Sequence, residues 1–143
     1  MAPKNPKTKA NPQLSKTPRK GYDENPLHLK PAWRVGYMEM CDPFGWHQTD
    51  AATLLQIREK LRSFESMTLG EILGPNNHMV PIHTLCKEAR DRVAVLHLDD
   101  IDELLSLRLG ATERIWGILE HNIVTLLWWD PDHCVCLSVK KRT

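Results

Sequence analysis

The sequence lacks any long hydrophobic run. Among its 143 residues, no apolar stretch approaches the roughly 18 residues that a membrane-spanning helix needs. Lys4, Lys7 and Lys9 are not followed by an apolar core, so we expect no secretory signal. The acid-poor start has the composition of a transit peptide but lacks its amphipathic spacing. We therefore expect a soluble, cytoplasmic protein with no membrane partner.

The cysteines lack the spacing of a disulfide framework or of a paired zinc site. The chain has no Cys-x-x-Cys, and its four cysteines are Cys41, Cys86, Cys134 and Cys136. Cys134 and Cys136 lie two apart on a predicted strand, where such neighbours rarely bond each other, so we expect reduced thiols. His121 and His133 would add soft ligands, but a zinc site usually brings two spaced ligand pairs. We expect no metal and no cofactor.

Charge is distributed unevenly. The formal net charge is only +1, yet residues 1–34 hold eight Lys/Arg against Asp23 and Glu24, a net +6, which leaves −5 for the rest. Residues 1–31 also contain six prolines and few large apolar groups, too few to offset the entropy of ordering. We predict a disordered basic arm over residues 1–31 and a single domain over residues 32–143. The arm either contacts an anionic partner or keeps the protein soluble.

Apolar periodicity predicts helices in the first half of the domain. Asp50 is a good N-cap for a helix over residues 50–67, and Thr68 and Glu71 have capping-box spacing for a short second helix. An apolar stripe predicts another long helix over residues 82–96. The acidic residues 99–103 indicate one more helical turn, in which carboxylates complement the helix dipole rather than bind a cation.

The second half alternates with the two-residue period of strands. We predict strands over residues 105–109, 114–120, 123–129 and 134–139, with a tight hairpin turn at residues 121–122. Trp128 and Trp129 should present one ring to each face of the sheet, one in the core and one available to pack under a helix, stack on a nucleobase or receive a peptide. Helices packed on one face of an antiparallel meander of about four strands give an α+β domain.

The region from residue 105 to residue 136 resembles the core of the RelE/ParE-like toxin superfamily. The resemblance rests on a strand ending in Leu-Arg-Leu-Gly (107–110), the run Arg-Ile-Trp-Gly-Ile (114–118), a hairpin, and an apolar strand. Residues 127–133 also resemble uncharacterised bacterial and prophage proteins. The superfamily consists of small toxins with a helical hairpin followed by an antiparallel sheet, many of which cleave messenger RNA on the ribosome. The resemblance implies a toxin of a type II toxin–antitoxin system, an mRNA endoribonuclease held inactive by an antitoxin protein.

The resemblance also implies site residues. Arg114 matches the arginine that begins the central strand and contacts the scissile phosphate, and His133 matches a basic residue after the next strand. Arg108 would add phosphate-clamping charge, and His133 would transfer a proton. The candidates for substrate binding are Lys87, Arg90 and Trp128. The sequence departs from the pattern at Cys136, where many members carry a tyrosine or second histidine, and in its acidic body.

Structural roles compete with these assignments. His133 is alternatively a turn residue bonded to Asp130 or Asp132, Lys87 and Arg90 a solvated helix face, and both arginines partners of nearby glutamates. The alternative function is a non-enzymatic interaction protein on the same fold, such as a gyrase-inhibitor-like toxin or a prophage accessory factor. A third possibility is a nucleic-acid-binding module that uses the basic arm alone.

Overall fold

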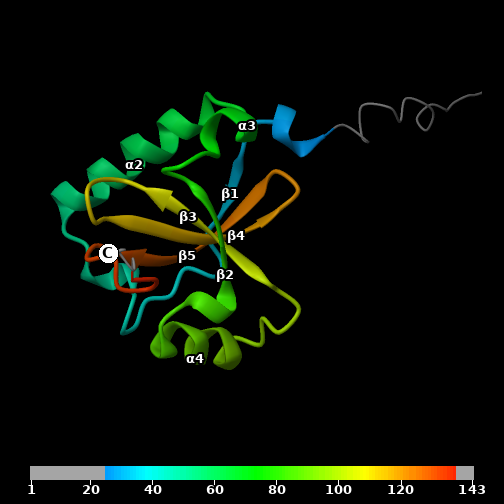
Figure 1. Cartoon of the computed structure of the whole chain (residues 1–143). Helices are drawn as coiled ribbons and strands as arrows, with labels where there is room; N and C mark the ends of the chain where they lie inside the picture. The colour runs from blue at the N-terminus through cyan, green and yellow to red at the C-terminus, as the bar shows by residue number, and fades with distance from the viewer. Residues whose placement is uncertain (1–24, 138–143) are drawn as a thin grey trace, which may run out of the picture.

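A five-stranded mixed sheet forms the centre of the protein (Figure 1). The structure, a computed structural model, describes residues 25–137. The strand order is β1-β5-β4-β3-β2; β1 pairs with β5 in parallel, and the other pairs are antiparallel. The strands are β1 (Ala32–Arg34), β2 (His78–Pro81), β3 (Glu103–Arg108), β4 (Arg114–Glu120) and β5 (Ile123–Asp130). The α-helices of the described part are α2 (Ala51–Glu65), α3 (Leu69–Ile72) and α4 (Lys87–Val95), with 3-10 turns η3 (Pro26–His28), η4 (Trp46–Gln48) and η5 (Ile82–Thr84).

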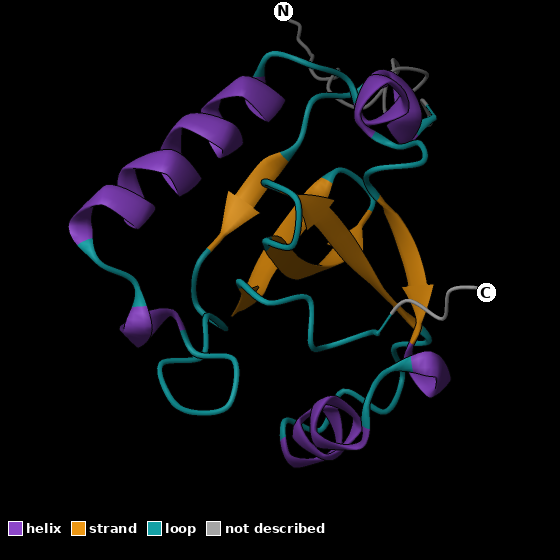
Figure 2. Ribbon diagram, turned by 60° about the vertical axis from the view of Figure 1, so that its left-hand side comes forward, coloured by secondary structure: helices purple, strands orange, loops and turns teal. Residues whose placement is uncertain are grey.

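The predicted α+β class is confirmed, but the helices cover both faces of the sheet. Ile57 and Phe64 of α2 pack with Leu105 and Ile115 on one face. Ala89 and Val93 of α4 pack on the other, in a cluster that includes Leu104, Trp116 and Trp128. Figure 2 shows the helices on either side of the strands. The prediction of helices on one face is therefore wrong, and α2 and α4 do not form the helical hairpin that the resemblance implies.

The central meander follows the prediction closely. β3, β4 and β5 occupy the three strands expected before residue 130, and residues 121–122 form the hairpin turn, with His121 at φ 61°. The predicted strand over residues 134–139 is wrong in its described part, since residues 134–137 pair with no strand and the chain bends at residues 135–136. The predicted helical turn at residues 99–103 is also wrong. A hydrogen-bonded turn occupies residues 99–100, and Glu103 already belongs to β3.

Helix starts depend on side-chain caps. Asp50 accepts a hydrogen bond from the Thr53 N–H at 2.8 Å, and Thr68 and Glu71 form the expected capping box. The helix predicted from residue 82 begins only at Lys87, because η5 and an extended Leu85 precede it. Within the described residues, no helix has the length and apolar character needed to cross a membrane.

The folded body begins earlier than predicted. η3 lies inside the expected arm, and the Leu29 carbonyl accepts a hydrogen bond from the Leu69 N–H at 2.8 Å, which ties this segment to α3. The boundary at residue 31 is therefore too late. The rest of the predicted disordered arm lies outside the described residues.

A nearly buried carboxylate fastens the segment between β1 and α2 to the core. The side chain of Glu39 is 8% exposed and pairs with Arg92 of α4. It also accepts a hydrogen bond from the Trp128 indole at 2.9 Å, while the Glu39 N–H donates to the Leu127 carbonyl at 3.0 Å. Burial alone would raise the pKa of Glu39, but the hydrogen bonds from Arg92 and Trp128 and the charge of Arg92 outweigh it, and the pKa lies below its ordinary value.

Glu39→Gln is expected to lower the free energy of unfolding at neutral pH by about 2 to 3 kcal/mol, because it leaves the Arg92 charge unpaired. Since the folded-state pKa of Glu39 is depressed, its ionic contribution is present above the unfolded pKa and is lost as the pH falls through the folded value. The variant should therefore lose less stability than the wild type on acidification below 4.5, the ordinary pKa. Denaturant unfolding at several pH values measures this.

Glu59→Gln serves as the control for this prediction. Glu59 pairs with Arg58 and Arg62 on the exposed side of α2, where ion pairs contribute little. We expect it to change stability by less than about 0.5 kcal/mol. Equal destabilisation by the two variants would contradict the role given to Glu39.

Candidate functional site

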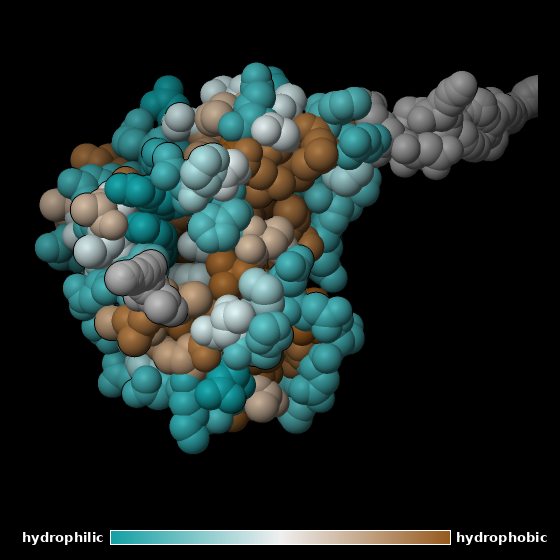
Figure 3. Space-filling model, viewed as in Figure 1, coloured by the Kyte–Doolittle hydropathy of each residue, from teal (hydrophilic) through white to brown (hydrophobic). Residues whose placement is uncertain are grey.

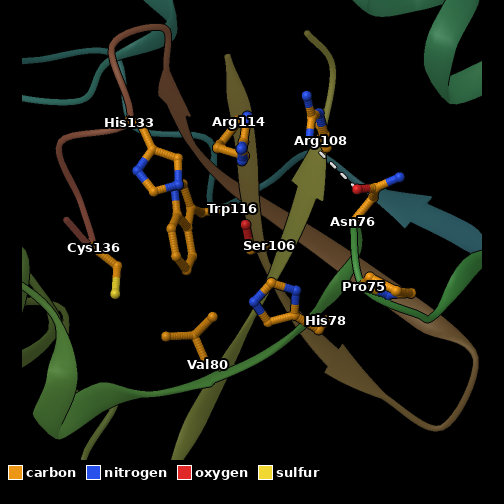
Figure 4. Close-up of a pocket in the computed structure, with 10 residues that line it drawn as sticks. All are labelled: Pro75, Asn76, His78, Val80, Ser106, Arg108, Arg114, Trp116, His133 and Cys136. Atoms are coloured by element: carbon orange, nitrogen blue, oxygen red, sulfur yellow. Dashed lines mark hydrogen bonds between the residues drawn. The ribbon is translucent and has the colours of Figure 1, made fainter. Parts of the chain in front are cut away.

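Three of the predicted site residues meet at one hollow on the α4-covered face of the sheet. The hollow has a volume of about 230 Å³ and lies where β2, β3, β4 and the segment after β5 come together (Figure 4). Arg108, Arg114 and His133 all line it, so the two residue types predicted for phosphate and proton chemistry face a common space. The remaining lining residues are Pro75, Asn76, His78, Val80, Ser106, Trp116 and Cys136. We call this the arginine–histidine hollow.

Strand register explains the convergence. Arg108 of β3 stands directly opposite Arg114 of β4, and Ser106, two residues before Arg108, stands opposite His78 of β2. Side chains two apart on a strand share a face, and directly paired residues lie on the same face. The rows Arg108–Arg114 and His78–Ser106–Trp116 therefore run side by side across the sheet.

The two arginines place unbalanced positive charge at the hollow. Like charges directly opposite each other on antiparallel strands repel. Burial lowers the pKa of Arg114, the charge of Arg108 lowers it further, and the charge of Asp130 acts in the opposite direction. Among the described residues, no aspartate or glutamate lines this hollow. The unbalanced charge favours the binding of an anion.

Backbone contacts hold Arg114 in place. Its Nη1 donates to the carbonyls of Gly110 at 2.9 Å and Glu113 at 3.0 Å, in the turn between β3 and β4. Nε and Nη2 of Arg114 have no hydrogen-bond partner within residues 25–137, and they remain able to donate to a ligand. Arg108 donates weakly to the Asn76 amide oxygen at 3.4 Å. In these contacts the arginines donate to neutral oxygens and not to carboxylates. The alternative that both arginines pair with nearby glutamates is therefore wrong.

Two imidazoles reach the same hollow from different elements. His133 is half-buried and projects from the segment after β5, whereas His78 is exposed and projects from β2 (Figure 4). The carboxylate of Asp130 bonds to the Trp116 indole and to the backbone amides of Cys134 and Val135, not to the His133 ring. A pair of imidazoles can supply a proton acceptor and a proton donor near neutral pH.

Sequence reasoning missed His78 and Ser106. Ser106 lies at the hollow because it is two residues before Arg108 on β3, whereas His78 reaches it only because β2, a strand of four residues, pairs with β3. A strand that short shows no clear period, so the sequence offers no signal that would place His78 opposite Ser106. Cys136, where the resembled toxins carry a tyrosine or histidine, does line the hollow.

The three residues predicted to bind substrate are not brought there. Trp128 is 0% exposed and its indole donates to Glu39, so the prediction of a stacking platform is wrong. As expected, the two tryptophans do face opposite sides of the sheet, but both are buried. Lys87 pairs with Asp91 at 2.8 Å on the exposed side of α4, and Arg90 donates to the Leu85 carbonyl. Both are helix-surface residues here and do not line the hollow.

The arrangement is suited to phosphate chemistry: two guanidinium groups, two imidazoles and a buried hydroxyl at Ser106 surround a space open to solvent. Within the described residues, no three His, Cys, Asp or Glu side chains are grouped to hold a metal ion. Comparisons with models of protein families, with characterised proteins and with solved structures find no match to this chain.

Proposed function

We propose that this protein is a metal-independent endoribonuclease that cleaves messenger RNA, as the toxin of a type II toxin–antitoxin system in the cytoplasm. The observation that carries the proposal is the convergence of Arg108, Arg114, His78 and His133 on one solvent-open hollow. RNA cleavage without a metal needs a base, an acid and positive charge at the phosphate, and these side chains supply all three.

The reaction begins when one imidazole accepts the proton of a ribose 2′-hydroxyl. The 2′-oxygen attacks the adjacent phosphorus, and Arg108 and Arg114 stabilise the negative charge on the phosphorane oxygens. The bond from phosphorus to the 5′-oxygen of the next nucleotide then breaks, and the second imidazole gives that oxygen a proton. The products are a 2′,3′-cyclic phosphate and a 5′-hydroxyl.

Partners follow from the same picture. The basic residues of the N-terminal arm, outside the described part, would attract RNA electrostatically, on or off the ribosome. An antitoxin that covers the hollow, or displaces either arginine, would stop cleavage. Negatively charged side chains of such an antitoxin would offset the repulsion between Arg108 and Arg114.

A non-enzymatic interaction protein is the second candidate, either a gyrase-inhibitor-like toxin or a prophage accessory factor. It is favoured by exposed apolar side chains beside α4: Tyr37 is 54%, Met40 60% and Val95 58% exposed. All three line a shallow depression of about 510 Å³. Exposed apolar groups gathered in this way are typical of protein-binding surfaces.

The proposal is tested with purified full-length protein and a transcript, in EDTA, with and without ribosomes. We expect cleavage that leaves a 2′,3′-cyclic phosphate. A matched transcript with a single 2′-deoxy nucleotide at the mapped position should resist cleavage there. RNA that stays intact with and without ribosomes would overturn the nuclease proposal, and growth arrest on expression without RNA cleavage would favour the interaction protein.

A further inference from the structure

A buried carboxylate lies behind the arginine–histidine hollow. Asp130, the last residue of β5, is 1% exposed. Its Oδ1 accepts a hydrogen bond from the Cys134 N–H at 2.8 Å, and its Oδ2 accepts from the Val135 N–H at 3.0 Å and the Trp116 indole at 3.1 Å. Three donors around one buried carboxylate make a strong, charge-assisted arrangement.

The two backbone amides directly follow His133, which has a φ of 58°. This left-handed conformation is uncommon for residues other than glycine, and it persists where the surrounding structure holds it. Asp130 holds the amides after His133, and the Val135 carbonyl accepts a hydrogen bond from the Cys86 N–H at 2.8 Å. Hydrogen bonds thus fix the two residues that follow His133.

Asp130 also belongs to the arginine row of the sheet. It stands directly opposite Arg114 on β4, and its charge favours the charged form of that guanidinium. One carboxylate therefore touches the segment that carries the candidate proton-transfer group and faces the candidate phosphate-binding group. In the described part of the chain, no other carboxylate is hydrogen-bonded to the segment after His133.

We propose that Asp130 is a positioning residue of this site: by fixing the amides of Cys134 and Val135 it orients the His133 imidazole toward the phosphate that Arg114 binds. This inference rests on the proposed function for its kinetic consequence, but not for its geometric one. An aspartate suits the position because it only accepts hydrogen bonds, whereas an asparagine would turn a donor toward at least one of the three N–H groups.

The kinetic test compares Asp130→Asn with the wild type. A small displacement of a catalytic group costs up to about 100-fold in rate, so we expect kcat for RNA cleavage to fall about 10- to 100-fold while KM changes less than about 2-fold. In a protein that already carries His133→Asn, adding Asp130→Asn should reduce kcat much less than Asp130→Asn does in the wild type. The reason is that Asp130 acts by orienting the His133 imidazole, which the first substitution removes. Cys134→Ser, which keeps the backbone amide, is the matched control and should leave kcat unchanged.

The geometric test needs no activity. In the wild type, the Cys134 and Val135 amides and the Trp116 indole N–H should exchange with deuterium as slowly as amides of β4, and Asp130→Asn should accelerate their exchange and shift the His133 ring signals in NMR spectra. Fast exchange at residues 134 and 135 in the wild type would overturn the inference even if Asp130→Asn failed to fold. Slow exchange in a protein that cleaves no RNA would support the role of Asp130 in holding the amides of residues 134 and 135, and would count only against the proposed function. Wild-type kcat and unchanged His133 signals in folded Asp130→Asn would overturn the positioning role and leave the nuclease proposal intact.

Discussion

His133→Asn is expected to reduce kcat for RNA cleavage by about 10²- to 10⁴-fold, the usual contribution of a positioned proton-transfer group. KM should change little, because the arginines that bind phosphate remain. Asparagine is the suitable replacement since it tolerates the left-handed backbone at φ 58°, whereas alanine would add strain. Because one imidazole acts as base and the other as acid, the wild-type rate should fall at both low and high pH, and the variant should lose one of these two dependences.

His121→Asn is a closely matched control. His121 has a φ of 61° in the hairpin turn between β4 and β5, and it is not among the residues that line the hollow. The same substitution in the same backbone conformation should leave kcat unchanged. If His133→Asn retains more than about a third of the wild-type rate, His133 is a structural turn residue and not a catalytic one.

The arginine part of the site could be predicted because it depends on local pairing. β3 and β4 are consecutive strands joined by a short turn, and alternation along each strand fixes which face Arg108 and Arg114 occupy. The hairpin at residues 121–122 then places β5 beside β4. No contact distant in sequence is needed to bring these two arginines together.

The histidine part depends on contacts that the sequence pattern does not show. His78 arrives on a short edge strand that pairs with β3, and His133 arrives on the turn after β5, directly before the residues 134–139 that were predicted as a strand. The turn forms because the Asp130 side chain takes the amides of Cys134 and Val135, which a strand would have offered to a neighbour. Side-chain capture of backbone groups over so short a span is not visible in hydrophobic periodicity.

The sequence does contain a sign that both faces of the sheet are covered. Leu104, Leu105 and Leu107 are all buried in β3, and β5 is buried from Val124 to Asp130. Strands that face solvent on one side alternate apolar with polar residues, whereas near-continuous apolar runs are typical of strands covered on both sides. Applied to residues 104–107 and 123–129, this rule would have placed the helices on opposite faces.

Arg114→Gln is expected to lower kcat/KM for RNA cleavage by about 10²- to 10³-fold, because it removes a fixed donor from the phosphate. It should also weaken anion binding, which can be measured without RNA. Inorganic phosphate at ten times its dissociation constant would stabilise the wild type by about 1.4 kcal/mol. That gain raises Tm by roughly 3 to 8 °C in a domain of this size, and the variant should lose most of it.

Arg62→Gln is the control that distinguishes the loss of Arg114 from the loss of any one positive charge. Arg62 is exposed on α2, where it bonds only to Glu59 among the described residues, and its loss should leave both cleavage and the phosphate response unchanged. Potassium chloride at matched ionic strength should not reproduce the stabilisation, because it screens charges without occupying the phosphate site at Arg114. An equal phosphate response in Arg62→Gln and Arg114→Gln would show that the anion binds elsewhere, and the repulsion between Arg108 and Arg114 would then have no ligand to relieve it.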